Sequence, residues 1–359
     1  MVTIQDIADR LGISVSTVSK GLNGGRDISE ALRQQVLDTA VEMGYTSKRK
    51  SRANKRIAFF IENMSCERED DFGYEILLGF QQGAFRNKDA VDVIPITPEF
   101  QQEIRYDNYM LENDYIAAFL LGLALNDPWM QQFKDTVFPT ILLDNFIPVN
   151  SKLGYVGTDS EEGIEMAISH LYALGHEKIA FLNGSKDSMV SDQRMRAYLH
   201  SMNKFHLPVD PNLAVYGYYV ADAAKYHVPA FLDAGVTAIL CGNDNIAEGV
   251  IKCVEEHGFS VPEDVSVIGF DDLPFASELN PPLTTIRQNR GALGKCAFFI
   301  LEGLISAVPA SKILLRPTLV NRSSTAIAKP RIAVRRTDSM DSVLRVNPRL
   351  YEENLKDQL

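Results

Sequence analysis

Hydrophobic spacing changes near residue 56 of the chain. Up to about residue 45, apolar residues recur three and four positions apart, the spacing of helices that pack on one face. From Arg56 onward, short continuous apolar runs alternate with helical stretches. The sequence therefore predicts a helical head at residues 1–45, a linker at 46–56 and an α/β core from residue 57.

The head is predicted to hold helices with recognisable starts and stops. They cover residues 4–11, 15–22 and 30–43. Each follows a residue suited to begin a helix, namely Thr3, Ser14 and Ser29. Two short helices, joined by a tight turn that contains Gly12 and braced by a third, form the helix-turn-helix layout of DNA-binding proteins.

The second predicted helix has two different faces. Val18 and Leu22 form its inward pair, and the outward set is Val15, Ser16, Ser19 and Lys20. Small polar residues fit the major groove without clashing, and a lysine can donate to guanine O6 and N7. The alternative is a small capped helical bundle that only supports the core.

The core is predicted to be an α/β fold of parallel sheets with helices on both faces. The strand candidates are residues 57–61, 91–96, 116–121, 140–144, 178–182, 213–217, 237–241 and 265–270. Ligands in such folds lie beyond the carboxyl ends of the strands. The residues just after the strands are polar: Asp144, Asn145, Asn183, Asn243, Asp244, Asp271 and Asp272. As a set they favour a cleft for a polyhydroxylated ligand, although each alone is equally suited to capping the next helix.

Charge divides the chain in the same place as hydrophobic spacing. The whole chain of 359 residues has a net charge of −11. Residues 1–56 carry ten Lys or Arg and six Asp or Glu, a net charge of +4, whereas the remainder carries −15. A basic head on an acidic body concentrates the attraction to DNA phosphates at one end.

Other classes of protein find little support. No apolar run approaches the roughly 20 residues of a membrane span, and the start MVTIQDIADR lacks the basic flank of a signal peptide. We therefore expect a cytoplasmic protein with no membrane partner. The cysteines Cys66, Cys241, Cys253 and Cys296 are scattered, and we expect no metal and no cofactor. Without a GxSxG elbow, a P-loop or a metal-spaced His cluster, no catalytic residue is predicted, and an α/β enzyme acting on a carbohydrate or a solute-binding protein is the alternative.

The segment TIQDIADRLGISVSTVSKGLNGGRDISEALRQQVLDTAVEMGY resembles the head of the lactose/galactose repressor (LacI/GalR) family almost from end to end. The resemblance implies that Val15, Ser16 and Lys20 read bases. It implies backbone contacts for Thr3, Ser14, Thr17, Ser19, Asn23 and Tyr45. Lys20 stands where the family usually has Arg, so a bidentate fork is replaced by a point charge.

The linker TSKRKSRANKR departs from that family. It has six basic residues, and we expect it to follow the DNA backbone through Lys48, Arg49, Lys50 and Arg52. A solvated tether is the alternative. Family members usually carry a hinge helix ending in a Leu that wedges into the minor groove. This shorter linker has no Leu, so we expect weaker operator bending.

The core resembles the same family in HLYALGHEKIAFL, AILCGNDNIAEGVIKCVEEHGFSVPEDVSVIGFDD and PPLTTIRQN. The resemblance implies two periplasmic-binding-protein-like lobes, each a doubly wound parallel sheet. Their expected bounds are residues 57–155 plus 284–317 and residues 156–283 plus 318–325. It implies effector contacts from Asp144, Arg194, Asn243 and Asp271, an aromatic wall from Tyr218 or Tyr219, and a second wall from Phe72 beside Asp71 and Tyr74.

The segment LRPTLVNRSST matches the usual end of the family's chain, which sets the end of the core at residue 325. Residues 326–359 form an extension, either a solvated tail or a small packing or oligomerisation element. Together the patterns predict a homodimeric DNA-binding repressor. It would bind a near-palindromic operator, and a sugar or sugar derivative in the cleft would control that binding. A nucleobase or a phosphoprotein corepressor is the alternative effector.

Overall fold

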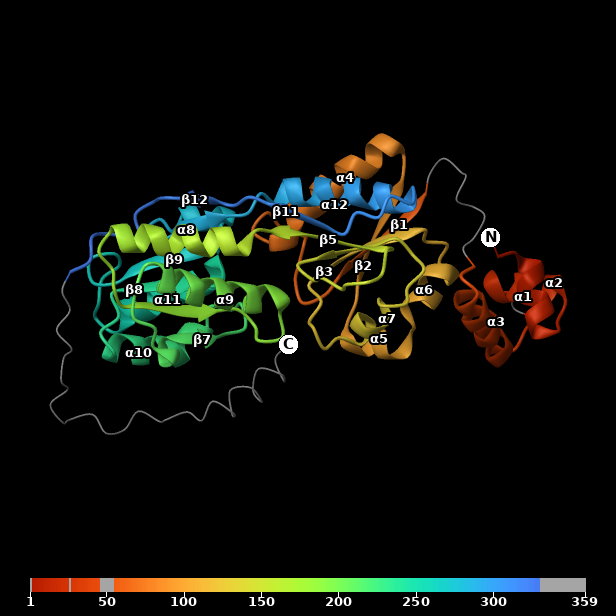
Figure 1. Cartoon of the computed structure of the whole chain (residues 1–359), viewed down its shortest axis with the longest axis horizontal. Helices are drawn as coiled ribbons and strands as arrows, with labels where there is room; N and C mark the ends of the chain where they lie inside the picture. Colours follow the sequence, from red (N-terminus) through yellow and green to blue (C-terminus); the bar gives the residue numbers. More distant parts are fainter. Residues whose placement is uncertain (1, 26, 46–54, 330–359) are drawn as a thin grey trace.

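The computed structural model describes residues 2–25, 27–45 and 55–329. Figure 1 shows a small helical head at one end and two α/β lobes beside it in a row. The predicted linker contacts Lys48, Arg49, Lys50 and Arg52, and most of the C-terminal extension, lie outside the described residues.

The head contains the predicted helices, held by their predicted caps. They are α1 (Ile4–Leu11), α2 (Val15–Leu22) and α3 (Glu30–Glu42). The Thr3 hydroxyl accepts from the backbone of Asp6, whose carboxylate accepts in return from the Thr3 backbone. Gly12 ends α1 with φ +66°, a conformation that glycine adopts without steric cost. The third helix ends one residue earlier than predicted.

The first lobe is built on a parallel sheet with strand order β11-β5-β4-β3-β1-β2. Its strands are β1 (Arg56–Ile61), β2 (Ala90–Pro95), β3 (Ala117–Leu121), β4 (Thr140–Leu143), β5 (Leu153–Thr158) and β11 (Lys312–Leu315). The sheet's helices are α4 (Phe72–Asn87), α5 (Pro98–Glu103), α6 (Tyr106–Glu112), α7 (Pro128–Gln132) and α12 (Arg290–Ile305). Because side chains alternate along a strand, Phe59 packs with Phe80 and Phe298 on one face, and Phe60 packs with Trp129 on the other.

The second lobe repeats this plan with strand order β12-β10-β9-β8-β6-β7. Its strands are β6 (Ile179–Asn183), β7 (Ala214–Tyr216), β8 (Ala238–Cys241), β9 (Ser266–Asp271), β10 (Thr284–Arg287) and β12 (Thr318–Val320). Its helices are α8 (Ser160–Ala173), α9 (Met189–Lys204), α10 (Ala223–Asp233) and α11 (Asp244–Glu256), with short 3₁₀ turns at η2 (Pro211–Leu213) and η3 (Pro274–Ser277). Only β12 pairs antiparallel within this sheet. The predicted fold class is confirmed.

The expected lobe boundaries need a correction at two places. Residues 284–287 were expected in the first lobe, but β10 pairs with β9 in the second. The Ser324 hydroxyl accepts from the Thr284 backbone and holds this strand in place. Strand β5 also stays in the first sheet to Thr158, past the expected boundary at residue 155. The strands β5, β10, β11 and β12 lack the continuous apolar runs that identified the others.

A buried acid, Glu62, lies just after β1 and close to Asp127, which precedes α7. Glu62 is 2% exposed and accepts from Gln101 Nε2 at 2.6 Å. Burial, with the nearby charge of Asp127, raises the pKa of Glu62 to about 8. Glu62 therefore folds as a neutral acid, and ionising it works against the folded state.

We expect this acid to make the protein less stable as the pH rises. The unfolded Glu62 loses its proton near its ordinary pKa, whereas the folded one keeps it until about pH 8. The stability that the protonated form contributes is complete at acidic pH and is lost on the way to about pH 8. Glu62→Gln should thus raise the melting temperature relative to the unsubstituted chain progressively more between about pH 5 and about pH 9.

The control is Glu103→Gln, since Glu103 is exposed. Thermal unfolding of the three proteins across this pH range is the measurement. An equal difference between Glu62→Gln and the unsubstituted chain at every pH would contradict the account.

Candidate nucleic-acid interface and ligand cleft

Helix α2 packs against the head with one face and leaves the other open. Val18 and Gly21 are buried, and a Cβ on Gly21 would lie 2.9 Å from Val36 Cγ1, so α2 and α3 approach closely. The side chain of Val15 is 37% exposed, and Ser16 and Lys20 are also exposed. The three predicted base readers therefore share an accessible surface.

Polar groups on this surface already have partners within the head. The Ser14 hydroxyl lies 2.8 Å from those of Ser16 and Thr17. Lys20 Nζ pairs with Asp27 Oδ2 at 3.1 Å. Because both side chains of this ion pair are largely exposed, the pair is weak, and a phosphate or base acceptor can replace Asp27.

The predicted backbone contacts differ in accessibility. Asn23 is exposed, and its Nδ2 donates to the Ser19 carbonyl at 2.6 Å. Thr3 uses its hydroxyl in the cap of α1. Tyr45 is only 7% exposed, so little of its side chain can meet a phosphate.

In the core, three charged side chains from both lobes come into electrostatic range. Asp144 follows β4 in the first lobe, and Arg194 and Asp271 belong to α9 and β9 in the second. Burial raises the pKa of Asp144 to about 7, with Arg194 opposing and Asp271 reinforcing the shift. Burial likewise raises the pKa of Asp271 to about 6, again opposed by Arg194. The charge of Arg194 thus opposes the rise in pKa of both carboxylates.

Arg194 is fixed from two sides although it is only 3% exposed. Its Nη1 donates to the Gly242 carbonyl at 2.6 Å, and its Cζ lies 3.7 Å from the centre of the Phe270 ring. Within the described residues its Nε has no hydrogen-bond partner. Gln288 Nε2 donates to Asp271 Oδ1 at 2.7 Å. Sequence reasoning missed Phe270 and Gln288, although Gln288 lies inside the quoted PPLTTIRQN.

Both aspartates that face Arg194 have a left-handed backbone. Asp144 has φ +56° and Asp271 has φ +119°. Such strain in residues other than glycine often occurs at functional sites, where surrounding structure holds it. The lobes also touch next to the cleft, where the Leu125 N–H donates to the Asp187 carbonyl at 2.8 Å.

Other polar residues after the strands serve the fold. Asn243 caps α11 through Oδ1 and donates from Nδ2 to the Tyr219 carbonyl, as the capping interpretation predicts. Its contact with an effector stays a prediction. Asp244 is fully buried and accepts from the Thr285 hydroxyl and the Leu273 N–H.

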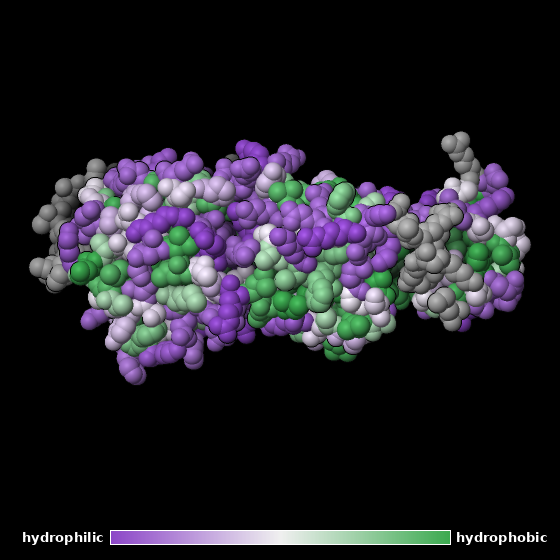
Figure 2. Space-filling model, turned by 90° about the horizontal axis from the view of Figure 1, so that it is seen from above, coloured by the Kyte–Doolittle hydropathy of each residue, from purple (hydrophilic) through white to green (hydrophobic). Residues whose placement is uncertain are grey.

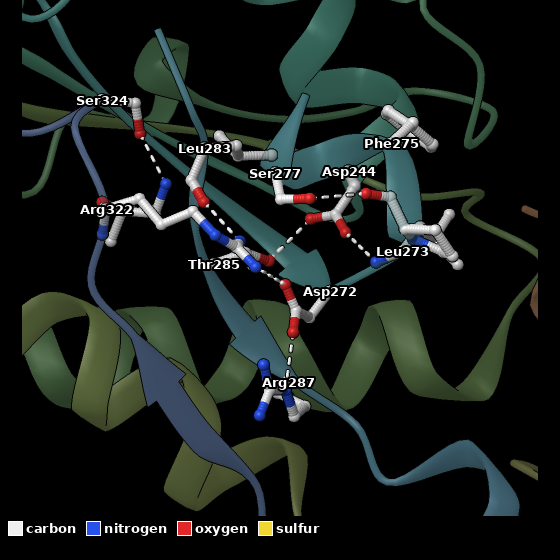
Figure 3. A network of polar contacts seen from close by, with 12 residues as sticks. Asp244, Asp272, Leu273, Phe275, Ser277, Leu283, Thr285, Arg287, Arg322 and Ser324 are labelled. Atoms are coloured by element: carbon white, nitrogen blue, oxygen red, sulfur yellow. Dashed lines mark hydrogen bonds and ion pairs between the residues drawn. The ribbon is translucent and has the colours of Figure 1, made fainter. Parts of the chain in front are cut away.

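Asp272 is held between two arginines (Figure 3). Its two oxygens each lie 2.6 Å from a guanidinium, one of Arg287 and one of Arg322. Asp272 therefore joins β9, β10 and the segment after β12. Both of its carboxylate oxygens are therefore engaged within the second lobe.

The residues predicted to form the aromatic walls, and Asp71, have contacts within the fold. The Tyr219 hydroxyl lies 2.6 Å from that of Ser191, and its ring covers Gly184, where a Cβ would come within 2.0 Å of the ring. Phe72 begins α4 and packs on the core of the first lobe. The Asp71 carboxylate accepts from the backbone of Arg68 at 2.8 Å and of Glu67. Their roles toward an effector stay predictions.

Two family descriptions match the chain. Residues 3–48 match the bacterial regulatory proteins of the lacI family, and residues 168–325 match the periplasmic binding protein-like domain. The chain therefore combines a DNA-binding head of the lacI family with a periplasmic binding protein-like core. It is therefore a transcription regulator with a DNA-binding head and an effector-binding core, and not a free-standing solute carrier.

Relatives of this lacI-family regulator match along nearly their whole length. The transcriptional repressor PurR of Vibrio atlanticus is 27% identical over 330 residues, covering 90% of this chain and 98% of the relative. The regulator MalR of Streptomyces coelicolor is 26% identical over 336 residues, covering 90% and 97%.

Solved structures share the fold. The lac repressor dimer bound to operator and the anti-inducer ONPF has a TM-score of 0.65 at 24% identity, covering 90% of this chain and 99% of that one. The CelR–cellobiose complex has a TM-score of 0.68 at 23% identity, covering 90% and 100%. In the part of this regulator that the structure describes, none of the helices combines the length and apolar character needed to cross a membrane. The same residues hold no cluster of three or more His, Cys, Asp or Glu arranged for a metal ion.

Removing Arg322 should destabilise the second lobe. Asp272 would keep only Arg287, and a buried carboxylate that loses a charged hydrogen-bond partner costs the fold about 2 to 3 kcal/mol. We therefore expect Arg322→Met to lower the free energy of unfolding by that amount in urea. Arg316→Met is the control, because Arg316 pairs with Glu162 while 86% exposed and should change the value by less than about 0.5 kcal/mol. Equal losses in the two variants would refute the role given to Asp272.

Proposed function

We propose that this lacI-family regulator binds a near-palindromic operator as a homodimer, with Val15, Ser16 and Lys20 reading bases in the major groove. The exposed face of α2 supports this assignment, because small side chains at its start leave room for base edges. Lys20 exchanges Asp27 for an acceptor on the DNA. Backbone contacts come from Thr3, Ser14, Thr17, Ser19 and Asn23 around it.

A homodimer is supported by an apolar surface on the first lobe. Helices α4 and α12 pack side by side and expose Leu78 (40%), Phe85 (83%) and Phe299 (74%). Figure 2 views the side on which these helices lie and shows hydrophobic residues gathered near the middle of the molecule. Exposed apolar patches of this kind mark protein interfaces. Pairing two copies through this surface would bring two heads to one operator.

The effector that we propose is a sugar or sugar derivative bound between the lobes. The observation that carries this proposal is the electrostatic interaction of Asp144 in the first lobe with Arg194 and Asp271 in the second. Carboxylates accept from pairs of hydroxyls, and a guanidinium donates to hydroxyl or ring oxygens. Relatives bear names that agree, since one solved structure is a CelR–cellobiose complex and another relative is named MalR.

Control of the operator follows from the position of these groups. A ligand that bridges Asp144 and Arg194 stabilises one angle between the lobes. Since the first lobe carries the head, that angle changes how the two heads of a dimer fit the operator. If the ligand changes the affinity for the operator by some factor, the operator must change the affinity for the ligand by the same factor.

A thermal-shift screen tests the effector assignment. Probes are cellobiose, maltose, glucose 6-phosphate, guanine and hypoxanthine, each added in excess. We expect a carbohydrate to raise the melting temperature and Asp271→Asn to abolish most of that rise, because the amide weakens the contact with Arg194 and the ligand hydroxyls. The control is Asp192→Asn, an exposed residue on α9. A rise with a purine alone would replace the sugar assignment, and an equal rise in Asp271→Asn would remove this cleft from the binding site.

Loss of Lys20 should weaken specific DNA binding. A duplex is first selected from a randomised pool with the full chain, and its complex is expected to contain two chains. Lys20→Ala should lower affinity for that duplex about 10- to 100-fold, the effect of one base contact. The control is Lys225→Ala, which removes an exposed lysine of the second lobe. The base-reading role is excluded if the ratio of selected to random DNA affinity stays the same in Lys20→Ala, as measured by fluorescence anisotropy.

A further inference from the structure

Helix α3 of the head lies against α6 of the first lobe (Figure 1). Asp38 on α3 accepts at Oδ1 from Arg105 Nη1 at 3.1 Å and from Asn108 Nδ2 at 2.9 Å. Arg33, one turn earlier on α3, lies 3.4 Å from Glu112 at the end of α6. Two ion pairs and a hydrogen bond thus join a head and a core that the sequence connects only through a short linker.

The order of the charges fixes the direction of this contact. Arg33 precedes Asp38 along α3, and Arg105 precedes Glu112 along the α6 segment. Because each cation pairs with the anion of the other segment, the two helices run antiparallel at the contact. Turning the head around would bring Arg33 to Arg105 and Asp38 to Glu112. Like charges would then face each other, which disfavours that arrangement.

Apolar packing supports the same contact. Val36 and Leu37 of α3 belong to one continuous hydrophobic cluster with Tyr106 and Phe60 of the first lobe. The contact also buries polar groups: Asn108 is 3% exposed, and the Arg33 side chain is 27% exposed. A chance touch between exposed surfaces would bury less of these side chains.

The contact leaves the reading surface open. Helix α2 lies on the side of the head away from α6 (Figure 1), and the Lys20 side chain is 48% exposed. The head can therefore stay docked while α2 enters a groove.

Helix α6 is also hydrogen-bonded to β4, the strand that Asp144 follows. The Tyr106 and Thr140 hydroxyls lie 2.6 Å apart, which connects the start of α6 to the start of β4. The same strand ends three residues later at Leu143, and Asp144 follows it. One short strand therefore separates the head's docking site from a proposed effector contact.

We propose that α6 is a docking site for this chain's own head, and that the contact of Arg33 and Asp38 with Glu112, Arg105 and Asn108 sets the spacing of the two heads on the operator. This contact holds the head in a fixed position relative to the core, which a linker without a wedging Leu does not do. The part concerning the operator rests on the proposed function, whereas the docking itself does not.

Hydrogen exchange on the full chain without DNA tests the docking. Glu112→Arg places a cation opposite Arg33 and suits the C-terminal end of a helix, so α6 should still form. Amides in α3 and α6 should exchange several-fold faster in this variant. Adding Arg33→Glu reverses the pair and should restore slow exchange. The control is Lys204→Glu, which breaks an exposed ion pair with Glu165 in the second lobe. Unchanged exchange of α3 and α6 in Glu112→Arg would overturn the docking.

Operator spacing tests the consequence. The duplex selected with the unsubstituted chain is remade with its half-sites one and two base pairs further apart. Glu112→Arg should bind the original duplex about fivefold more weakly, since a head held only by its linker has a lower effective concentration. It should also lose less affinity than the unsubstituted chain when the spacing changes. If only the added positive charge mattered, Glu112→Arg would bind the duplex more tightly rather than more weakly.

Equal affinity and equal spacing preference in the two proteins would overturn the proposed role even if exchange shows the contact. Failure of the unsubstituted chain to select any duplex would instead refute the proposed operator function, and the exchange experiment would still decide the docking.

Discussion

The cleft depends on one buried guanidinium. Arg194 is almost inaccessible to water, and a buried cation requires compensating charge and hydrogen bonds. It receives a carbonyl from Gly242, the face of the Phe270 ring and the charges of Asp144 and Asp271. Because Asp144 belongs to the first lobe and Asp271 to the second, the electrostatics of Arg194 link the two halves of the core.

The polar residues after the strands divide into those that hold the sheet together and those that face the cleft. Asp244 and Asp272 have both oxygens occupied by partners within the second lobe. Asp144 and Asp271 keep raised pKa values because burial leaves their charge less well compensated. The adjacent Asp271 and Asp272 thus have different partners: Asp271 accepts from Gln288, whereas Asp272 pairs with Arg287 and Arg322.

The head is part of the same mechanical system. Its third helix rests on α6, and α6 is anchored at the start of β4, the strand that Asp144 follows. A change of lobe angle at the cleft therefore moves a head that is docked on the first lobe.

Sequence alone determined the head and the alternation of strands and helices in the core. Local signals suffice there: caps such as Thr3 and Ser14 hydrogen-bond within one turn, and buried parallel strands such as residues 57–61 must be apolar. Tertiary structure alone decided that β10 joins the second sheet, that Asp272 pairs with Arg322, and that Arg33 meets Glu112. These contacts join residues far apart in the chain, and their partners are chosen by how whole elements pack, which no local pattern of residues specifies.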